Sequence, residues 1–442
     1  MRECDRDATE LDTSHGLLTS CKKKELEDVV MSNRWRVCFA ALIGVALCAS
    51  MSFAQEWPQW RGPARTGAAV DFKVPAAWPD RPKQIWKVQV GAGHASPVVA
   101  SGRVFLLSRM GEQEAVSARE VGTGKEIWRA AYDAPYQMNP AATSHGKGPK
   151  STPAHDRGRL FTFGVSGILS AWQAQDGRLL WRRDFKKEFP STAPDFGVAM
   201  SPIVVGDLVI VHAGGMGNGA VLALDVSSGA TKWSWKGDGP AYASPIVADL
   251  GGTRQIVTQS QKHVIGLSLA DGRLLWEIPF VTDYEQNSVT PIVVKDLLIY
   301  AGLNKPAAAA RVSVAAGKWQ ISPAWQNPDL PMYMSTPVES GGYLFGLTNR
   351  NRGQFFCLDL GTGKTMWTTK GREAENAAFL TAGPLVMVMT TEGELVVLRS
   401  NSKAFEPVKR YTLAESPVWA HPALVGGGIV VKDLDTLAYW VF

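Results

Sequence analysis

The 442-residue chain has little cysteine, no long hydrophobic run and no strong excess of one charge. An apolar stretch of about a dozen residues begins at Val37, but a membrane-spanning helix needs about 20. The net charge of +5 is dispersed and forms no basic stripe, so nucleic-acid binding is not indicated. Only Cys357 lies beyond residue 54, which excludes an internal disulfide in that part of the chain.

The N-terminal region has the pattern of a cleaved export signal. Arg34 and Arg36 precede the apolar stretch, and small residues follow at Ser52 and Ala54. This arrangement predicts a signal peptide that is cut after Ala54. We therefore expect a periplasmic or secreted protein with no membrane span.

Two further features concern the same region. Leu47 stands where lipoprotein motifs have Gly or Ala, so a lipid anchor at Cys48 is not expected. The residues before Met31 are more charged than an export signal, and the sequence leaves open whether translation starts at Met1 or at Met31.

Two short signatures alternate along the rest of the chain. The first is Ser or Thr, then Pro, then an apolar run, and its prolines are Pro97, Pro153, Pro202, Pro245, Pro291 and Pro337. The second is Gly-x-x-x-Trp, found at Gly124/Trp128, Gly177/Trp181, Gly229/Trp233, Gly272/Trp276 and Gly363/Trp367. Each repeat of roughly 40 to 50 residues holds four short runs rich in Val, Ile, Leu and Phe, separated by turn residues. This pattern predicts an all-β propeller of four-stranded antiparallel blades.

The glycines are expected in the tight turn between the third and fourth strands, and the tryptophans between neighbouring blades. The sequences GTGKEIW (residues 122–128) and GTGKTMW (residues 361–367) resemble a phosphate-binding loop. Leu358 stands in place of that loop's first glycine, however, and Trp367 follows where a helix should run. We therefore interpret these segments as turns, with Lys364 exposed to solvent.

Counting the repeats gives eight blades. We expect the aromatic residues that dock one blade on the next to be Trp86, Trp128, Trp181, Trp233, Trp276, Trp325, Trp367 and Tyr411. Trp325 is chosen in the irregular fifth blade and Tyr411 in the seventh. The last segment has only three strands, so the strand around Trp86 is predicted to complete it and to close the ring by pairing the N- and C-terminal strands.

These signatures resemble the propeller of the pyrroloquinoline-quinone (PQQ) proteins, the eight-bladed architecture of PQQ dehydrogenases and of the BamB outer-membrane assembly factors. The segment WPQWRGPARTG (residues 57–67) is similar to the lead-in of exported PQQ-like repeat proteins. The resemblance implies three parts: an N-terminal extension and signal peptide (1–54), a strap packed on the propeller (55–80) and the propeller itself (81–442). Trp57 and Trp60 are expected to fix the strap.

The same resemblance implies either an enzyme or a scaffold. PQQ dehydrogenases carry two adjacent, disulfide-bonded cysteines and a calcium ion beside the quinone, but this sequence has no adjacent cysteine pair and no calcium-binding loop. No catalytic residue and no metal ligand can be assigned, and no cofactor is expected. PQQ with calcium belongs only to the alternative, a PQQ-dependent oxidoreductase.

A ring of side chains is expected at one mouth of the central channel. Three residues before each proline, or before its replacement, the sequence has His94, Lys150, Ala199, Tyr242, Ser288, Met334, Glu375 and Trp419. Of these, His94, Lys150, Tyr242, Ser288, Glu375 and Trp419 are candidate ligand-binding residues. The competing interpretation is a wet channel mouth without a ligand.

The loop of residues 139–153 is longer than a blade turn needs. Its His145 and Lys147 are candidate contacts for an anion or for an acidic patch of a partner, and a solvated loop is the alternative.

The resulting hypothesis is an exported, non-catalytic, monomeric scaffold that binds another envelope protein. A carbohydrate-active enzyme is a further alternative, and it would need two carboxylates about 5 to 10 Å apart in the channel.

Overall fold

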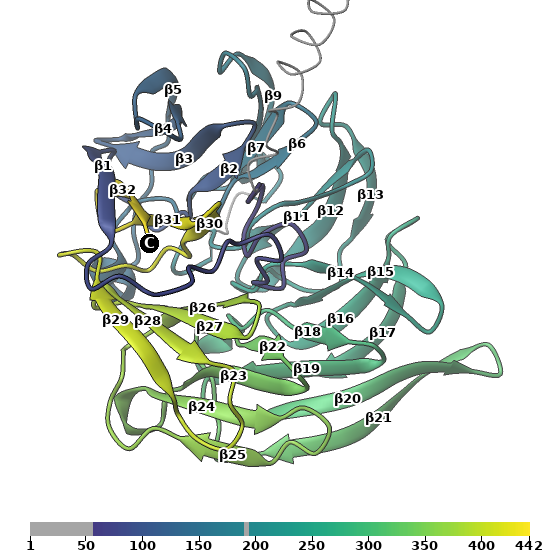
Figure 1. Ribbon diagram of the computed structural model, residues 1–442. Helices are drawn as coiled ribbons and strands as arrows, with labels where there is room; N and C mark the ends of the chain where they lie inside the picture. The colour runs from purple at the N-terminus through teal and green to yellow at the C-terminus, as the bar shows by residue number, and fades with distance from the viewer. Residues whose placement is uncertain (1–55, 190–193) are drawn as a thin grey trace, which may run out of the picture. The chain divides into compact units, whose positions relative to one another are not determined.

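Figure 1 shows the computed structural model, which describes residues 56–189 and 194–442. The chain divides into two units at residues 53 and 54, and every described residue belongs to the second. The predicted signal peptide, its cleavage site and Cys48 lie outside the described residues. Within the described ranges, no helix combines the length and the apolar character needed to cross a membrane.

The second unit is an eight-bladed β-propeller, which confirms the predicted fold class. Each blade is a four-stranded antiparallel sheet, and in seven of the eight blades the strands are consecutive in the chain; in the eighth, β1 lies beside β32. Four short 3-10 helices lie between strands of the described part: η1 (Pro140–His145), η2 (Phe185–Lys187), η3 (Asp283–Glu285) and η4 (Arg350–Arg352).

The strands of blades 1 to 4 are β2 (Val98–Ala100), β3 (Arg103–Met110), β4 (Gln113–Glu120) and β5 (Glu126–Asp133); β6 (Ala154–Asp156), β7 (Arg159–Phe163), β8 (Ile168–Gln173) and β9 (Leu179–Asp184); β10 (Ile203–Val205), β11 (Leu208–Gly215), β12 (Asn218–Asp225) and β13 (Thr231–Trp235); β14 (Ile246–Leu250), β15 (Thr253–Gln259), β16 (His263–Ser268) and β17 (Leu274–Pro279).

The strands of blades 5 to 8 are β18 (Ile292–Val294), β19 (Leu297–Gly302), β20 (Lys305–Ala315) and β21 (Lys318–Asn327); β22 (Val338–Ser340), β23 (Tyr343–Thr348), β24 (Gln354–Asp359) and β25 (Thr365–Thr368); β26 (Ala377–Ala382), β27 (Leu385–Thr390), β28 (Glu394–Arg399) and β29 (Pro407–Thr412); β30 (Ala423–Val425), β31 (Gly428–Lys432), β32 (Thr436–Val441) and β1 (Lys83–Gln89).

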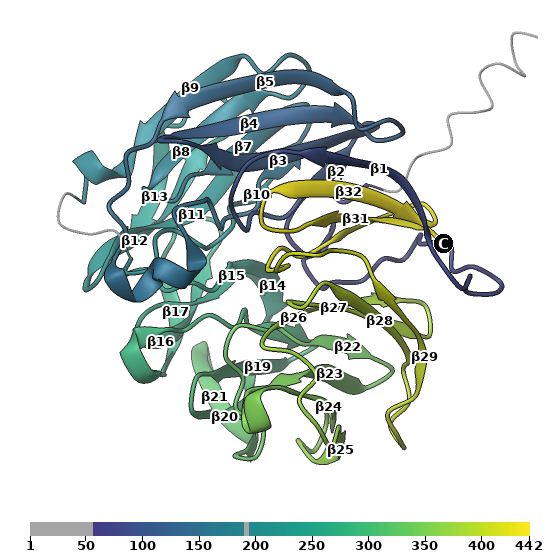
Figure 2. The same ribbon diagram turned by 90° about the vertical axis from the view of Figure 1, so that its left-hand side faces the viewer.

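The ring closes through its last blade, as predicted. Strand β1 pairs antiparallel with β32, from Lys83 opposite Val441 to Gln89 opposite Thr436. Figure 2 shows β1 lying beside β32, so the two ends of the chain complete one sheet. No blade of the ring is therefore left with three strands.

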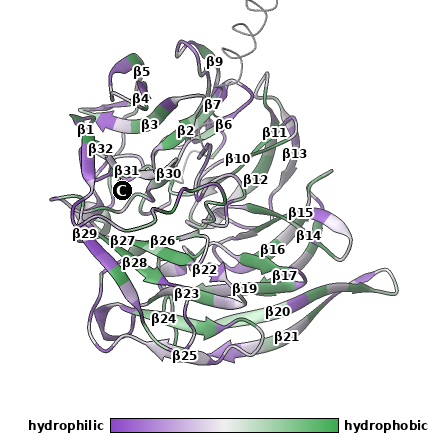
Figure 3. Ribbon diagram, viewed as in Figure 1, coloured by the Kyte–Doolittle hydropathy of each residue, from purple (hydrophilic) through white to green (hydrophobic). Residues whose placement is uncertain are grey.

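The core lies between the blades. Strands close to the channel, such as β26 and β27, are buried on both faces, because neighbouring blades cover each of them. Figure 3 shows these strands as mostly hydrophobic and β29, an outer strand, as largely hydrophilic. The apolar runs that marked strands in the sequence are therefore the surfaces that join one blade to the next.

The recurring tryptophans link successive blades through a repeated hydrogen bond. In each case the indole N–H donates to a backbone carbonyl of the next blade: Trp86 to Val121 (2.7 Å), Trp128 to Ala174 (3.1 Å), Trp181 to Val226 (3.0 Å), Trp233 to Leu269 (3.0 Å), Trp325 to Leu360 (2.9 Å) and Trp367 to Asn401 (2.8 Å).

The glycine of the signature makes room for the indole of the preceding blade. Gly229 has φ +70° and lies so close to Trp181 that a Cβ atom there would come within 2.7 Å of the ring. The same close approach joins Gly124 to Trp86, Gly177 to Trp128, Gly272 to Trp233 and Gly363 to Trp325. Glycine is thus required twice, for the left-handed backbone and for the contact.

A small residue on the third strand faces five of the six docking tryptophans across the sheet, whereas Trp86 faces Tyr439. These cross-strand partners are Ala118, Ala171, Ala223, Ala309 and Cys357, opposite Trp128, Trp181, Trp233, Trp325 and Trp367. A larger side chain there would compete with the indole for the space between blades. This residue is therefore a third part of the repeat, which the sequence signatures did not include.

Two of the eight expected docking residues make different contacts. The indole of Trp276 donates to the Oε1 atom of Gln255 in its own blade (2.6 Å). The next blade is extended into the long hairpin of β20 and β21, and its Gly317 has no neighbouring ring. The hydroxyl of Tyr411 donates to the carbonyl of Pro79 in the strap (2.7 Å), and its ring lies 5.7 Å from that of Phe442, which follows β32 of the next blade.

Residues 56–80, called the strap from here on, pack on the propeller. Buried Trp57 exchanges two backbone hydrogen bonds with Val99 of β2. Thr381 of β26 bonds the backbone of Gly67 and Ala69 in the same way. The purple trace in Figure 1 crosses the centre of the ring between these points. The strap therefore covers one end of the channel.

Candidate functional site

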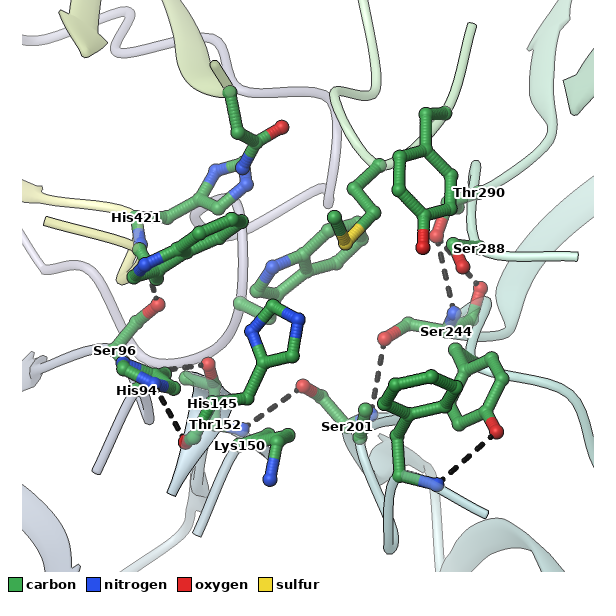
Figure 4. A pocket seen from close by; sticks show the side chains of 18 of the residues that line it. His94, Ser96, His145, Lys150, Thr152, Ser201, Ser244, Ser288, Thr290 and His421 are labelled. Atoms are coloured by element: carbon green, nitrogen blue, oxygen red, sulfur yellow. Dashed lines mark hydrogen bonds between the residues drawn. The ribbon is translucent and has the colours of Figure 1, made fainter. Parts of the chain in front are cut away.

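The Ser/Thr-Pro signature forms a ring of hydrogen bonds around the channel. The backbone N–H of the residue before each proline donates to the hydroxyl of the equivalent residue in the next blade. The successive pairs are Ser96 to Thr152 (3.2 Å), Thr152 to Ser201 (3.0 Å), Ser201 to Ser244 (2.9 Å), Ser244 to Thr290 (3.1 Å) and Thr290 to Thr336 (3.1 Å). Several of these bonds are drawn in Figure 4.

The ring of hydroxyls explains why the signature needs Ser or Thr and why two blades depart from it. In blade 8 the N–H of His421 donates to the hydroxyl of Ser96 (2.9 Å), so the series of bonds runs from blade 8 through blades 1 to 6 and is interrupted at blade 7. In blade 7 Ala377 has no hydroxyl, and its own N–H donates back to Ser335 (3.0 Å). The hydroxyls are buried and satisfied, so they position the channel wall.

Two buried arginines of the strap hold it across the channel. Arg61 donates to the carbonyls of Thr336 (2.7 Å) and Pro337 (2.8 Å) in blade 6. Arg65 donates to the carbonyls of Ser201 (3.2 Å) and Pro245 (2.8 Å), in blades 3 and 4. Burial lowers the pKa of each guanidinium to about 9, so both are charged at neutral pH.

A pocket of about 170 Å³ lies at the channel mouth. Trp60 of the strap belongs to its lining, and the arginines of the strap line a separate cavity. The structure brings seven of the eight predicted ring positions to this pocket: His94, Lys150, Ala199, Tyr242, Ser288, Met334 and Trp419. The wall of the pocket is therefore formed mainly by residues that shortly precede the inner strands of the blades (Figure 4).

A collar of aromatic rings surrounds the pocket. The ring of His145 meets Trp419 (5.1 Å between centroids) and Phe196 (6.0 Å) edge-on. Phe196 in turn meets Tyr242 edge-on (5.8 Å), and His94 lies 6.1 Å from Trp419. These rings present flat apolar surfaces and edges to whatever occupies the space between them.

Lys150 is the cation of the pocket wall. Its ammonium is partly buried and makes one long hydrogen bond, to the carbonyl of Gly146 (3.4 Å). Among the described residues no carboxylate lies within ion-pair distance of it. Burial lowers the pKa of Lys150 to about 8, and the distant charge of Glu114 opposes this shift. At neutral pH the pocket therefore holds a positive charge without a neighbouring counter-ion.

The histidines of the pocket are neutral at the same pH. Burial, together with the charge of nearby cations, lowers the pKa values of His94 and His421 to about 3, and burial also lowers the pKa of His145. The Nε2 atom of His94 lies 3.0 Å from the carbonyl of His145 and therefore donates to it. The Nδ1 atoms of His94 and His421 are buried, and no described residue bonds them.

The remaining predicted residues lie at the rim. Glu375 is absent from the pocket lining and instead lines a shallow depression with Asn349, Arg352 and Arg372. Lys147 points away from the pocket and pairs with exposed Glu112 (3.3 Å).

The loop of residues 139–153 forms a wall of the pocket. Its segment η1 places His145 in the lining, and the carbonyl of Pro149 accepts hydrogen bonds from the N–H groups of His94 and Ala95. The loop joins β5 of blade 1 to β6 of blade 2, and its extra residues form this part of the pocket wall.

The comparison with known families decides where this chain belongs. The family profile described as outer membrane protein assembly factor BamB matches residues 112–369, more than half of the chain. The chain belongs to the BamB family. This confirms the resemblance to BamB-like PQQ repeat proteins.

Individual BamB proteins align over most of the chain. BamB of Yersinia pestis is 26% identical over 376 residues, which cover 81% of this chain and 78% of that protein. BamB of Moranella endobia (strain PCIT) is 24% identical over 306 residues, which cover 65% of this chain and 62% of that protein.

Solved structures share the propeller architecture. The crystal structure of BamB from Moraxella catarrhalis matches 82% of this chain and 98% of its own, with a TM-score of 0.59 and 16% identity. Quinohemoprotein alcohol dehydrogenase from Comamonas testosteroni matches 88% of this chain and 80% of its own, with a TM-score of 0.64 and 14% identity. At these identities the likeness describes the fold alone.

The residues of the pocket do not fit the PQQ and calcium arrangement of the dehydrogenases. No Asp, Glu or Cys is among the lining residues, and Cys357 is buried inside blade 6. In the described ranges no group of three or more His, Cys, Asp and Glu side chains could hold a metal ion. The lining also lacks the carboxylate pair that a glycoside hydrolase requires.

Sequence reasoning missed several residues that complete the pocket in this BamB family member: Trp60, Phe196, Gln286, Tyr333, Asn376 and His421. Most of them lie in connections that do not repeat from blade to blade. His421 had a signal, because it precedes Pro422 where the other blades have Ser or Thr. Trp60 was expected in the strap but not in the pocket.

Proposed function

We propose that this protein is a non-catalytic scaffold that binds another envelope protein during the assembly of outer-membrane proteins. The match of the BamB family profile over residues 112–369 carries this proposal. The alignment with BamB of Yersinia pestis over 81% of the chain supports it. The protein works as a monomer in the periplasm after cleavage behind Ala54, with residues 55–80 as strap and 81–442 as propeller.

The lining of the pocket contains no carboxylate and no cysteine, which supports a scaffold. General acid–base chemistry needs a titratable group with a pKa near the working pH and in contact with the reactant. Of the three histidines in the lining, His94 and His421 have pKa values of about 3, burial also lowers the pKa of His145, and no carboxylate is present to act as a partner for His145 or Lys150.

The proposed partner contact lies around Lys147, at the rim of the channel mouth. The side chains of Lys147 and Glu112 are 44% and 66% exposed, and such surface ion pairs contribute about 0 to 1 kcal/mol. Lys147 is therefore free to exchange Glu112 for an acidic group of a partner at little cost.

Deletion of the gene tests the assembly role. We expect fewer folded outer-membrane β-barrels, seen as a loss of heat-modifiable bands in gel electrophoresis, and recovery with the plasmid-borne gene. Unchanged amounts of folded barrels in the deletion strain would exclude the role.

Charge reversal tests the contact. Lys147→Glu should weaken cross-linking to the envelope partner and lower complementation, while Lys364→Glu, an exposed turn residue on the opposite face, should leave both unchanged. Equal effects of the two variants would exclude Lys147 as the contact. The oxidoreductase alternative predicts dye reduction with alcohols or sugars when PQQ and calcium are added, and we expect none.

A further inference from the structure

The channel-mouth pocket has a use that the scaffold role does not require. We propose that it binds a small carboxylate carried on a flat aromatic body, with the carboxylate at Lys150 and the ring inside the aromatic collar. This collar consists of His94, His145, Phe196, Tyr242 and Trp419.

The charge of the pocket favours an anion. The ammonium of Lys150 has no carboxylate within ion-pair distance among the described residues, and no Asp or Glu lines the pocket. A partly buried ammonium that gives only one long hydrogen bond has lost hydration without gaining a counter-ion. A carboxylate would restore the missing partner through a charge-assisted hydrogen bond.

The walls favour an aromatic body. Three successive ring pairs of the collar meet edge-on, from Trp419 through His145 and Phe196 to Tyr242, with centroids 5.1 to 6.0 Å apart. An aromatic ring of a ligand that lies in the pocket, against this row of side chains, would extend the same edge-to-face packing. Aliphatic acids lack the flat faces that this arrangement rewards.

The size of the pocket limits the ligand to about one ring. Its volume is about 170 Å³, and an apolar cavity of about 150 Å³ is known to hold one benzene molecule. Trp60 of the strap lies in the lining, whereas the strap arginines Arg61 and Arg65 line a different cavity and would not contact the ligand.

Two nitrogen atoms of lining residues lack a hydrogen-bond partner among the described residues. The Nδ1 atom of His421 is buried without a hydrogen-bond partner in the described part of the chain, and so is that of His94. Since His94 donates through Nε2, its Nδ1 atom can only accept a hydrogen bond.

Benzoate is the probe, and the full mature protein is titrated by calorimetry and by its intrinsic tryptophan fluorescence. We expect saturable one-to-one binding of benzoate, and binding at least about tenfold weaker for benzamide, its uncharged analogue, and for acetate, which lacks the ring. No saturable binding of benzoate, or benzamide binding as tightly as benzoate, would overturn the proposal.

A matched pair of variants locates the anion. Lys150→Met should weaken benzoate binding by about tenfold or more, while Lys262→Met, an exposed lysine outside the pocket, should leave it unchanged. Equal benzoate affinity in both variants refutes the assignment to Lys150. Circular dichroism verifies folding of each variant, and the benzamide comparison is made on the unmodified protein, so it stands even if Lys150→Met does not fold.

Discussion

Replacing Gly229 by alanine tests whether the docking of tryptophan on glycine holds the blades together. Gly229 has φ +70°, and a Cβ atom there would lie 2.7 Å from Cε3 of Trp181. The left-handed backbone costs an alanine about 1 to 2 kcal/mol. Forcing an extra methyl group against a packed ring costs about 1 to 3 kcal/mol more. The sum predicts a loss of about 2 to 5 kcal/mol in the free energy of unfolding.

Gly102 provides the matched control for this experiment. It has φ +72°, but a Cβ atom there would meet nothing within 4 Å. Gly102→Ala should therefore lose only the backbone contribution, about 1 to 2 kcal/mol. The difference between the two variants isolates the contact with Trp181.

Equilibrium urea unfolding, followed by far-UV circular dichroism, measures both variants without relying on tryptophan fluorescence. In a Trp181→Ala background, where the ring is gone, Gly229→Ala should cost no more than Gly102→Ala does. The reasoning is refuted if Gly229→Ala and Gly102→Ala lower stability equally in the unmodified protein.

Three further predictions concern the strap, the hydroxyl ring and a buried histidine. Arg65→Met should lower the free energy of unfolding by at least about 2 kcal/mol, because the carbonyls of Ser201, Pro202 and Pro245 lose a charged donor. The control Arg157→Met, at an exposed arginine, should change it by less than about 1 kcal/mol, and similar urea midpoints for the two variants would contradict the prediction. Ser244→Ala should cost about 1 to 2 kcal/mol in the same assay, since the N–H of Ser201 loses its acceptor, and a cost no larger than that of exposed Ser227→Ala would count against the ring. Burial lowers the pKa of His212 to about 4 in the folded protein. Between pH 6.5 and 4 the unfolded chain therefore binds more protons than the folded protein does. The free energy of unfolding should fall by up to about 3 kcal/mol as the pH drops from 6.5 to 4. His212→Gln should show a correspondingly smaller fall in urea midpoint over that range, and an identical pH dependence would disprove the assignment.

The sequence alone predicted the blades because the signals are local and repeat. Gly229 and Trp233 are four residues apart, and each such pair marks the turn into a fourth strand. Periodicity also predicted the closing strand around Trp86, since the last segment lacked one strand. The ring at the channel mouth followed from the same count, and only Glu375 lies outside the pocket.

The contacts of Trp276 show that the repeated sequence signature does not always predict how a tryptophan packs. Its signature is intact, but the next blade has replaced the docking turn by the long hairpin of β20 and β21. Whether a tryptophan docks depends on the neighbour that receives it, and that neighbour is encoded more than 40 residues further along the chain.

What the sequence determined by itself is the architecture: the number of blades, the order of their strands and the positions that face the channel. What only the tertiary structure decided is how these positions combine. Arg61 reaches a carbonyl 275 residues away, because the ring brings distant segments together. The same arrangement leaves Lys150 with no carboxylate of the described residues within ion-pair distance. Short-range patterns fix backbone conformation, whereas charge balance and pocket shape depend on through-space neighbours that no local pattern contains.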